Sequence, residues 1–288
     1  MYINIIQYFC ALNEYPMVRI PVWKVLILLL FANISFAQRG WEAGGGLGLT
    51  YYFGDLNTQF RFDKPGPQVN LAARFNFNER LSWKFAVSYG YIYASDSTSP
   101  NAFERARNLS FRSHLGELSG QFEFNFLPYN HLNRYDNWTP YMFLGFSTFY
   151  FNPQAKLDDN YISLRSLGTE GQFKGEEYYT IQPSLVYGAG VKADFNEYWS
   201  INIEISLRRL FTDYLDDVSK EYPDKEDLLG LRGPTALLLS NRALPENSLR
   251  YRFGEPGRQR GNSKDNDSFN FVSVNALYYF GSVKCPKM

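Results

Sequence analysis

Residues 41–55 read WEAGGGLGLTYYFGD, and this stretch decides the fold. Its aromatic and aliphatic residues predict a β-strand, yet Gly44, Gly45, Gly46 and Gly48 interrupt it. Glycine weakens a strand, because it adds entropy to the unfolded chain and removes side-chain packing. Glycines are tolerated in a strand where neighbouring groups need the space that a side chain would fill. We therefore expect one face of this strand to lie in a crowded interior.

Period-2 alternation of apolar and polar residues recurs along the chain after Gln38. Only residues 78–80 separate two such runs, which predicts a hairpin. A change of phase at residues 116–118 predicts a β-bulge in the fourth strand, and the fifth strand is apolar on both faces. The expected strands are 41–53, 68–78, 81–93, 111–126, 140–151, 184–195, 199–207 and 269–280.

The connections between these strands alternate in length. Short links at 78–80, 127–139 and 196–198 alternate with long ones, the longest being 152–180 and 212–268. Short turns on one side of a membrane and long loops on the other are typical of outer-membrane barrels. The pattern predicts an all-β fold, an eight-stranded antiparallel up-and-down transmembrane β-barrel of the OmpA-like type with long extracellular loops.

A soluble barrel of the lipocalin type, with its apolar face inside, is the alternative fold. The polar faces of the expected strands carry Gly44, Gly46, Gly48, Gly90, Gly188 and Gly190. A surface facing water has no use for them, whereas an eight-stranded barrel is only just wide enough for its side chains. We therefore expect the polar face inside, with glycines making room for long charged residues.

Charged residues on this inward face should pair across the lumen, because buried ions are costly unless paired. This interpretation makes the network a structural filling of the barrel, with a transport path as the alternative. The expected members of the lumen charge network are Arg74, Lys84, Lys192 and Arg208 with Glu42, Glu123, Asp194 and Glu204.

Composition agrees with a membrane barrel. The 288 residues carry no net charge, 18% are aromatic and the mean hydropathy is −0.34, which gives no sign of a nucleic-acid-binding surface or of a helical membrane protein. Aromatic residues at both strand ends predict two interfacial girdles. The periplasmic girdle is Trp41, Trp83, Trp138 and Trp199; the outer one is Tyr51, Phe53, Tyr91, Tyr93, Tyr150 and Phe151.

Residues 1–37 have the features of a signal peptide. Lys24 precedes the apolar run VLILLLFANISFA, which ends in small residues suited to cleavage before Gln38. Met17 is an alternative start, because it already gives an ordinary n-region. We expect residues 38–288 to form a single barrel domain in the cell outer membrane, in which Cys285 has no partner for a disulfide.

Few residues are candidates for catalysis or ligand binding. His114 lies near Ser110 and Ser113, but their spacing does not single out a catalytic triad, and His131 falls in an expected turn. The acidic last loop lacks the spacing of a calcium-binding EF-hand. We therefore expect no enzyme, no cofactor and no metal. Basic residues of that loop are candidates for lipid A phosphates or for pairing with its acidic half: Arg250, Arg252, Arg258, Arg260 and Lys264.

Several phrases resemble the PorG-like family of small outer-membrane barrels, found in bacteria with type IX secretion. They include YYFGDLN (51–57), PYMFLGF (140–146), SLGTEGQ (166–172), RRLFTDYLDDVSKEY (208–222), RGNSKDND (260–267) and VKCPK (283–287). Within them, Asp213, Tyr214, Asp216, Asp217, Arg260 and Asn262 form the family-motif loop, whose acidic residues we expect to order the loop against Arg208 and Arg209.

The resemblance implies a non-catalytic outer-membrane component of type IX secretion that docks periplasmic ring proteins similar to PorK and PorN. The turn 127–139 and the tail 281–288 are the expected docking surface, since a ring below the membrane reaches only that side. The alternatives are a stand-alone barrel that binds lipopolysaccharide or an external partner, and a lipid-modifying enzyme. Outer-membrane lipid and lipopolysaccharide are expected partners in any case.

Overall fold

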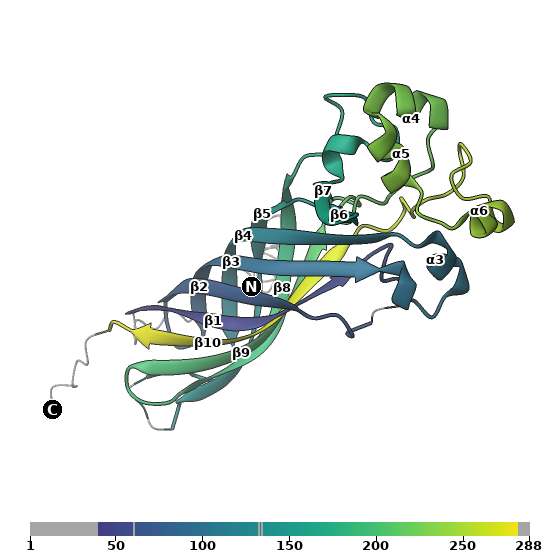
Figure 1. The fold of residues 1–288 in the computed structure, drawn as a ribbon. Coiled ribbons are helices and arrows are strands. Elements are labelled where there is room, and N and C mark those ends of the chain that lie inside the picture. Colours follow the sequence, from purple (N-terminus) through teal and green to yellow (C-terminus); the bar gives the residue numbers. More distant parts are fainter. Residues whose placement is uncertain (1–39, 60, 132, 134, 282–288) are drawn as a thin grey trace, which may run out of the picture. The chain divides into compact units, whose positions relative to one another are not determined.

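The computed structural model describes residues 40–281, with the exception of 60, 132 and 134 (Figure 1). The expected signal peptide, the alternative start at Met17 and the tail 282–288 lie outside the described residues.

Eight long antiparallel strands form a closed barrel, as the alternation predicted. Neighbouring strands pair in chain order, and β1 pairs with the last strand, β10, which closes the sheet. Closure removes both sheet edges, so every strand has a partner on each side. The strands are β1 (Gly40–Phe53), β2 (Gly66–Asn76), β3 (Leu81–Ser95), β4 (Ser110–Asn125), β5 (Trp138–Phe151), β8 (Ile181–Asp194), β9 (Trp199–Leu210) and β10 (Ser268–Tyr279).

The long connections gather at one end of the barrel, and the short turns lie at the other (Figure 1). Period-2 patterns did not reveal the small elements inside these loops, because the helices have at most eight residues and the two strands only four each. They are β6 (Gln154–Leu157), β7 (Asn160–Ser163), the 3₁₀ turns η2 (Asp96–Thr98) and η3 (Arg165–Leu167), and the helices α3 (Ala102–Arg107), α4 (Lys225–Arg232), α5 (Pro234–Ser240) and α6 (Pro245–Tyr251). Among the described residues, no helix is long and apolar enough to cross a membrane.

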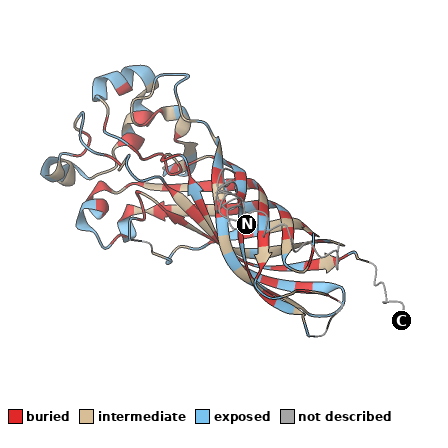
Figure 2. Cartoon of the chain, turned by 180° about the vertical axis from the view of Figure 1, so that it is seen from behind, coloured by how far each residue is buried: buried red, intermediate tan, exposed pale blue. Residues whose placement is uncertain are grey.

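Apolar side chains cover the outside of the barrel. Leu47, Leu71 and Phe146 are each at least 70% exposed, and exposed residues alternate with less exposed ones along the strands (Figure 2). A lipocalin-type barrel would show the reverse pattern, so that alternative is wrong. A closed barrel satisfies all its backbone hydrogen bonds, and an apolar exterior suits it to hydrocarbon. The chain is therefore an outer-membrane protein.

The interior changes character along the barrel axis. Its periplasmic half is polar, but near the outer end Ile92, Phe111, Phe149 and Phe269 point inward and pack with apolar loop residues such as Leu215. The expectation of a wholly polar inward face is thus wrong at the outer end, because the loops close over the barrel and exclude water there. Phe151 belongs to this core and Phe53 is buried, so neither contributes to the outer girdle.

The same change in polarity explains why the prediction of a bulge in the fourth strand is wrong. β4 pairs with β3 without interruption from Ser110 to Phe124, and no bulge occurs at residues 116–118. The apparent change of phase arises because Phe111 and Leu115 point inward into the outer core, while His114 on the opposite face is exposed.

The strand glycines do provide space, but for neighbours other than those expected. A Cβ on Gly46 would lie 2.0 Å from the side-chain oxygen of Asn275 and 2.5 Å from the carbonyl oxygen of Val274. At Gly188 it would lie 2.6 Å from the ring of Phe143. The expectation that these glycines make room for charged partners is therefore wrong. They admit amides, aromatic rings and the adjacent strand backbone.

Candidate functional site: the filled lumen and its periplasmic turn

A chain of ion pairs crosses the periplasmic half of the lumen. Arg74 of β2 lies 2.9 Å from Glu42 of β1 and 2.9 Å from Glu123 of β4, and all three side chains are fully buried. Glu123 also lies 3.0 Å from the amine of Lys192 on β8. Alternation places these residues inside, and facing strands bring opposite charges together, so each buried ion has a partner of opposite charge.

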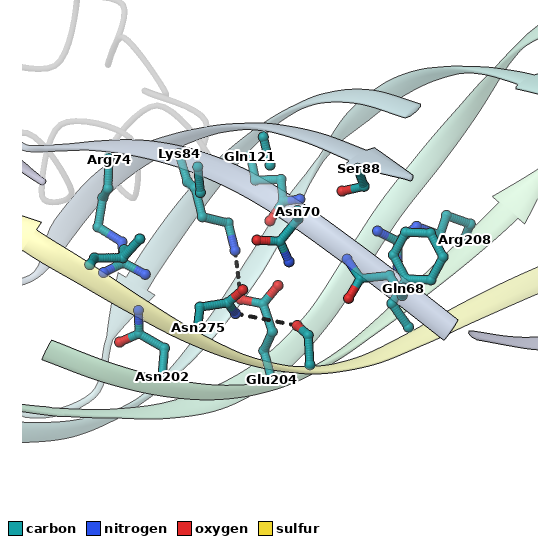
Figure 3. A pocket seen from close by; sticks show the side chains of 15 residues that line it. Gln68, Asn70, Arg74, Lys84, Ser88, Gln121, Asn202, Glu204, Arg208 and Asn275 are labelled. Carbon is teal, nitrogen blue, oxygen red and sulfur yellow. Dashed lines mark hydrogen bonds and ion pairs between the residues drawn. The ribbon is translucent and has the colours of Figure 1, made fainter. Parts of the chain in front are cut away.

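Lys84 extends the network towards the other side of the barrel. Its amine lies 2.6 Å from Glu204 of β9 (Figure 3). The same amine lies 3.5 Å from Glu123. The hydroxyl of Tyr141 donates a hydrogen bond to Glu204 at 2.9 Å. Amides such as Asn70 and Gln121 line the remaining pocket, which has about the room of one water molecule.

Arg208 makes a separate pair above this network. Its guanidinium donates two hydrogen bonds to Glu117 of β4, at 3.0 and 2.9 Å, and its carbon Cζ lies 3.8 Å from the ring centre of Phe271. Within the described part of the chain, none of the expected anions pairs with Arg208. Sequence reasoning missed Glu117, because the wrongly expected bulge at 116–118 obscured the face on which it lies.

The periplasmic turn between β4 and β5 is tied to the floor of the barrel. His131 lies with Nε2 3.1 Å from Glu42 and Nδ1 2.8 Å from Asp194, and its ring stacks on Tyr279 at 4.4 Å. The hydroxyl of Tyr129 donates a hydrogen bond to Asp194. The turn therefore closes the lower mouth of the barrel.

The environment of His131 favours its cation. Burial by itself lowers the pKa of an imidazole, but the carboxylates of Asp194 and Glu42 outweigh burial and raise the His131 pKa to about 9. We expected Asp194 to pair with a lumen lysine or arginine. In the structure it pairs with His131 instead. No signal in the sequence marked His131, because turn residues give no periodicity.

The periplasmic tryptophans lie at the strand ends nearest this turn. Trp41, Trp138 and Trp199 are each more than 40% exposed on the outer surface, and Trp83 is partly exposed beside Phe122. Trp41 packs on Phe75, with ring centres 5.0 Å apart. Such amphipathic rings suit the boundary between membrane and periplasm.

At the other end, the family-motif loop folds into a cap on the barrel. Asp216 accepts a hydrogen bond from the hydroxyl of Tyr52 at 2.5 Å, and Asp217 accepts one from Tyr178 at 2.8 Å. Arg260 lies 3.0 Å from Glu170 and donates to the carbonyl oxygen of Asp217 at 2.5 Å.

The motif residues therefore join distant loops. We expected the acidic residues to order the loop against Arg208 and Arg209, but among the described residues no hydrogen bond or ion pair links them to these two arginines. The backbone N–H of Asn262 donates to both carboxylate oxygens of Asp55, at 3.1 and 2.9 Å. Asp213 and Tyr214 begin the same loop, where Tyr214 stacks on Tyr178 at 4.9 Å. Hydrogen bonds of this kind provide partners for backbone N–H groups of the loops, which have none in a helix or a strand.

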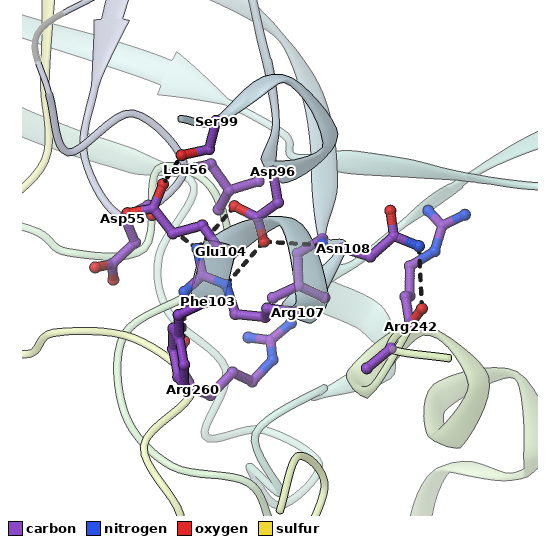
Figure 4. A network of polar contacts seen from close by, with 12 residues as sticks. Asp55, Leu56, Asp96, Ser99, Phe103, Glu104, Arg107, Asn108, Arg242 and Arg260 are labelled. Carbon is purple, nitrogen blue, oxygen red and sulfur yellow. Dashed lines mark hydrogen bonds and ion pairs between the residues drawn. The ribbon is translucent and has the colours of Figure 1, made fainter. Parts of the chain in front are cut away.

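A second buried pair anchors the cap to the loop that contains α3. Arg107 donates to both carboxylate oxygens of Asp96, at 2.8 and 2.9 Å, and to the carbonyl oxygens of Asp55 and Arg260 (Figure 4). One guanidinium thus joins three loops. Sequence reasoning did not single out Asp96 or Arg107, because their pairing depends on loop conformation.

Several buried carboxyl groups of the cap have raised pKa values. Burial raises the pKa of Asp55 and of Asp217 to about 6 and that of Asp213 to about 8. Burial and neighbouring carboxylates raise the pKa of Asp216 and Asp267 well above the usual range. In the described part of the chain, no three acidic, histidine or cysteine residues are placed to hold one metal ion together.

The residues considered for catalysis do not lie close enough together to form a catalytic site. His114 is exposed on the outer face of β4, where its Nδ1 lies 2.6 Å from the hydroxyl of Tyr89. Ser113 is fully buried on the opposite face and accepts a hydrogen bond from the N–H of Asn152. Ser110 lies 3.2 Å from Arg242. A serine–histidine pair would need both side chains on one face.

Comparison with known proteins identifies a family. Residues 21–238 match the model of the family described as "Domain of unknown function (DUF6089)". No curated protein matches the chain in sequence.

Solved structures of outer-membrane barrels are similar to this one. The attachment invasion locus protein Ail of Yersinia pestis, in complex with the heparin analogue sucrose octasulfate, is 11% identical with a TM-score of 0.41, covering 84% of this chain and all of Ail. The N-terminal β-barrel domain of Pseudomonas aeruginosa OprF is 11% identical with a TM-score of 0.37, covering 84% of this chain and all of that domain. Neisserial surface protein A is 9% identical with a TM-score of 0.41, covering 83% of this chain and 97% of its own.

Proposed function

The chain belongs to the DUF6089 family, and from its geometry we propose that it is a non-catalytic outer-membrane component of the type IX protein secretion machinery that docks periplasmic ring proteins. The observation that carries this proposal is the filled lumen, in which Arg74, Glu42, Glu123 and Lys192 are buried and paired. A barrel filled in this way is suited to anchoring partners and not to conducting solutes.

The periplasmic turn supports the docking role. Tyr129 and His131 tie it to the barrel floor, while Tyr135 of the same turn is 92% exposed. A large aromatic residue held on a fixed loop is a good anchor for a protein interface, because little entropy is lost on binding. The short turns after β2 and β8 offer much less surface.

The specific link to type IX secretion rests on the motif phrases that resemble the PorG-like family, above all TDYLDDVS (212–219) and RGN (260–262). Ring proteins similar to PorK and PorN are accordingly the proposed partners. A non-catalytic role is supported by the separation of Ser113 and His114 on opposite faces of β4.

Site-specific photo-crosslinking in a native host tests the docking role. A photoreactive amino acid at Tyr135 should crosslink to a periplasmic ring protein, while the same label at Tyr179, 78% exposed at the other end of the barrel, should not. Crosslinks from Tyr179 alone, or from neither position, would contradict the proposed docking surface.

Two deletions complete the test. Removal of the gene should stop export of type IX cargo, and unchanged export would overturn the secretion role. Removal of residues 281–288 should weaken association with the ring. Phe280 should be kept in that deletion, because its backbone N–H donates to Trp41 in the closing strand pair.

A further inference from the structure

An open groove runs along the outside of the barrel where β8, β9 and β10 reach their outer ends. Its lining includes Tyr187, Leu207, Arg209, Asn270 and, from the last loop, Lys264. Tyr187 pairs with Leu207, and Leu207 pairs with Asn270, so these three side chains form one row across neighbouring strands. The groove is therefore built on the rigid barrel wall, with one side formed by the loop.

Two cations of this groove are free of internal partners. Arg209 and Lys264 are both exposed, and within the described part of the chain neither side chain makes a hydrogen bond or an ion pair. Arg208, the neighbour of Arg209, points inward to Glu117. Arg209 is thus an outward cation on the barrel wall, and no carboxylate of the described residues forms an ion pair with it.

The level of Arg209 coincides with the outer boundary of the membrane. Arg209 lies on the same outward face of β9 as Trp199, which marks the periplasmic boundary. Ten residues of a strand tilted by about 40° rise about 25 Å, the height of the apolar band of such barrels. The lipid headgroups of the outer leaflet therefore lie beside Arg209.

The acidic residues of the groove accept hydrogen bonds from the last loop. The carboxylate of Asp55 accepts from the N–H of Asn262, and that of buried Asp267 accepts from the N–H of Leu215 at 2.9 Å. Asp265 accepts from the side-chain amide of Asn262 at 2.8 Å. Each carboxylate thus accepts a hydrogen bond from the last loop, and among the described residues none of the three forms an ion pair with Arg209 or Lys264.

We propose that this groove binds the phosphate group of an outer-leaflet glycolipid of the lipid A type. Arg209 and Lys264 contact the phosphate, Asn270 lies beside the sugar, and Leu207 and Tyr187 contact the acyl chains. Arginine suits this role, because its planar guanidinium donates two parallel hydrogen bonds to a phosphate and it is weakly hydrated. This lipid site does not depend on the secretion role.

Native mass spectrometry of the full mature barrel in detergent tests the site. The probes are bisphosphorylated lipid A, a phosphate-free lipid A with the same acyl chains, and inorganic phosphate as competitor. The test variant is R209Q/K264Q. The matched control is K225Q/R258Q, which removes the same charge from exposed cations that do not line the groove. Heat-modifiable migration on gels verifies that each variant is folded.

We expect the test variant to bind bisphosphorylated lipid A about tenfold or more weakly, while the control binds as wild type. Phosphate-free lipid A should bind wild type as weakly as the test variant binds the phosphorylated lipid. An equal loss in test and control variants would show diffuse charge attraction and overturn the site. Equal binding of phosphate-free lipid, or displacement by inorganic phosphate at equal concentration, would also overturn it. Because all these measurements use purified protein, they leave the secretion proposal untouched.

Discussion

His131 illustrates how much a single residue depends on its surroundings. In sequence it is one histidine in a polar turn, but in the structure it bridges Glu42 and Asp194 at the mouth of the barrel. Both carboxylates are buried, so a cation between them relieves a repulsion that solvent cannot screen. The residue therefore links the stability of the barrel floor to the position of the proposed docking turn.

Replacing His131 with alanine should lower the free energy of unfolding at pH 7 by about 2–3 kcal/mol, because two buried carboxylates lose a shared cation. The His131 pKa is raised in the folded state to about 9, so its stabilising effect is complete below pH 6.5 and is lost as the pH rises through 9. Urea unfolding followed by tryptophan fluorescence should therefore show the deficit at pH 7 and little of it at pH 10. Exposed His114, replaced by alanine, is the control, and a deficit independent of pH would contradict the ion-pair explanation.

Gly46 and Gly116 form a matched pair for testing the crowded interior. Gly46→Ala should destabilise the barrel by about 1–3 kcal/mol, because the new methyl group meets Asn275 and the backbone of Val274. Gly116→Ala should change stability by less than about 1 kcal/mol and should favour the folded state, because a Cβ there meets no atom within 4 Å. Urea midpoints of the two variants in the same detergent give the comparison, and similar values would show that crowding is not the reason for Gly46.

At the scale of elements, the extracellular cap is held by ion pairs between loops more than by its short helices. Asp224 caps α4 through the N–H groups of Glu226 and Asp227, but this bond is local. Arg260 instead joins Glu170, Asp217 and the carbonyl oxygen of Ser240, which come from separate segments. These bonds between separate segments add to the apolar contacts of the cap, so losing them should make the cap open more often.

Arg260→Gln should raise the rate at which proteinase K cleaves the loop 211–267 by roughly tenfold or more, because a buried guanidinium with three loop contacts is lost. The barrel itself should still show heat-modifiable migration, since no strand residue contacts Arg260 in these pairs. Arg258→Gln, two residues away and exposed, is the control. Equal cleavage of both variants would show that Arg260 does not hold the cap.

At the scale of the whole molecule, both ends of the barrel should lose stability in alkaline solution. The raised carboxyl pKa values mean that the folded cap holds protons more tightly than the unfolded chain does. Their stabilising effect is therefore present at acidic pH and lost as the pH rises through about 6 for Asp55 and Asp217 and about 8 for Asp213. His131 adds its own loss near pH 9.

The free energy of unfolding should thus fall by about 3 kcal/mol or more between pH 5 and pH 9. Urea titrations at steps of one pH unit would measure the fall. Asp213→Asn should remove the part of this fall that occurs near pH 8, since the asparagine amide does not titrate. A free energy that rises over this range would show that the buried carboxyl groups are not protonated in the folded state.

The sequence by itself determined the barrel: strand number follows from period-2 alternation, strand order from the alternating short and long connections, and the inward direction of the polar face from its glycines. It also marked most of the ionic residues of the lumen, because a charge on an inward face has nowhere else to lie. The tertiary structure alone decided the partners, such as Glu117 for Arg208 and His131 for Asp194. It also placed an apolar core at the outer end and folded the cap. These features depend on contacts between residues far apart in the chain and on loop conformations, and neither leaves a local period in the sequence.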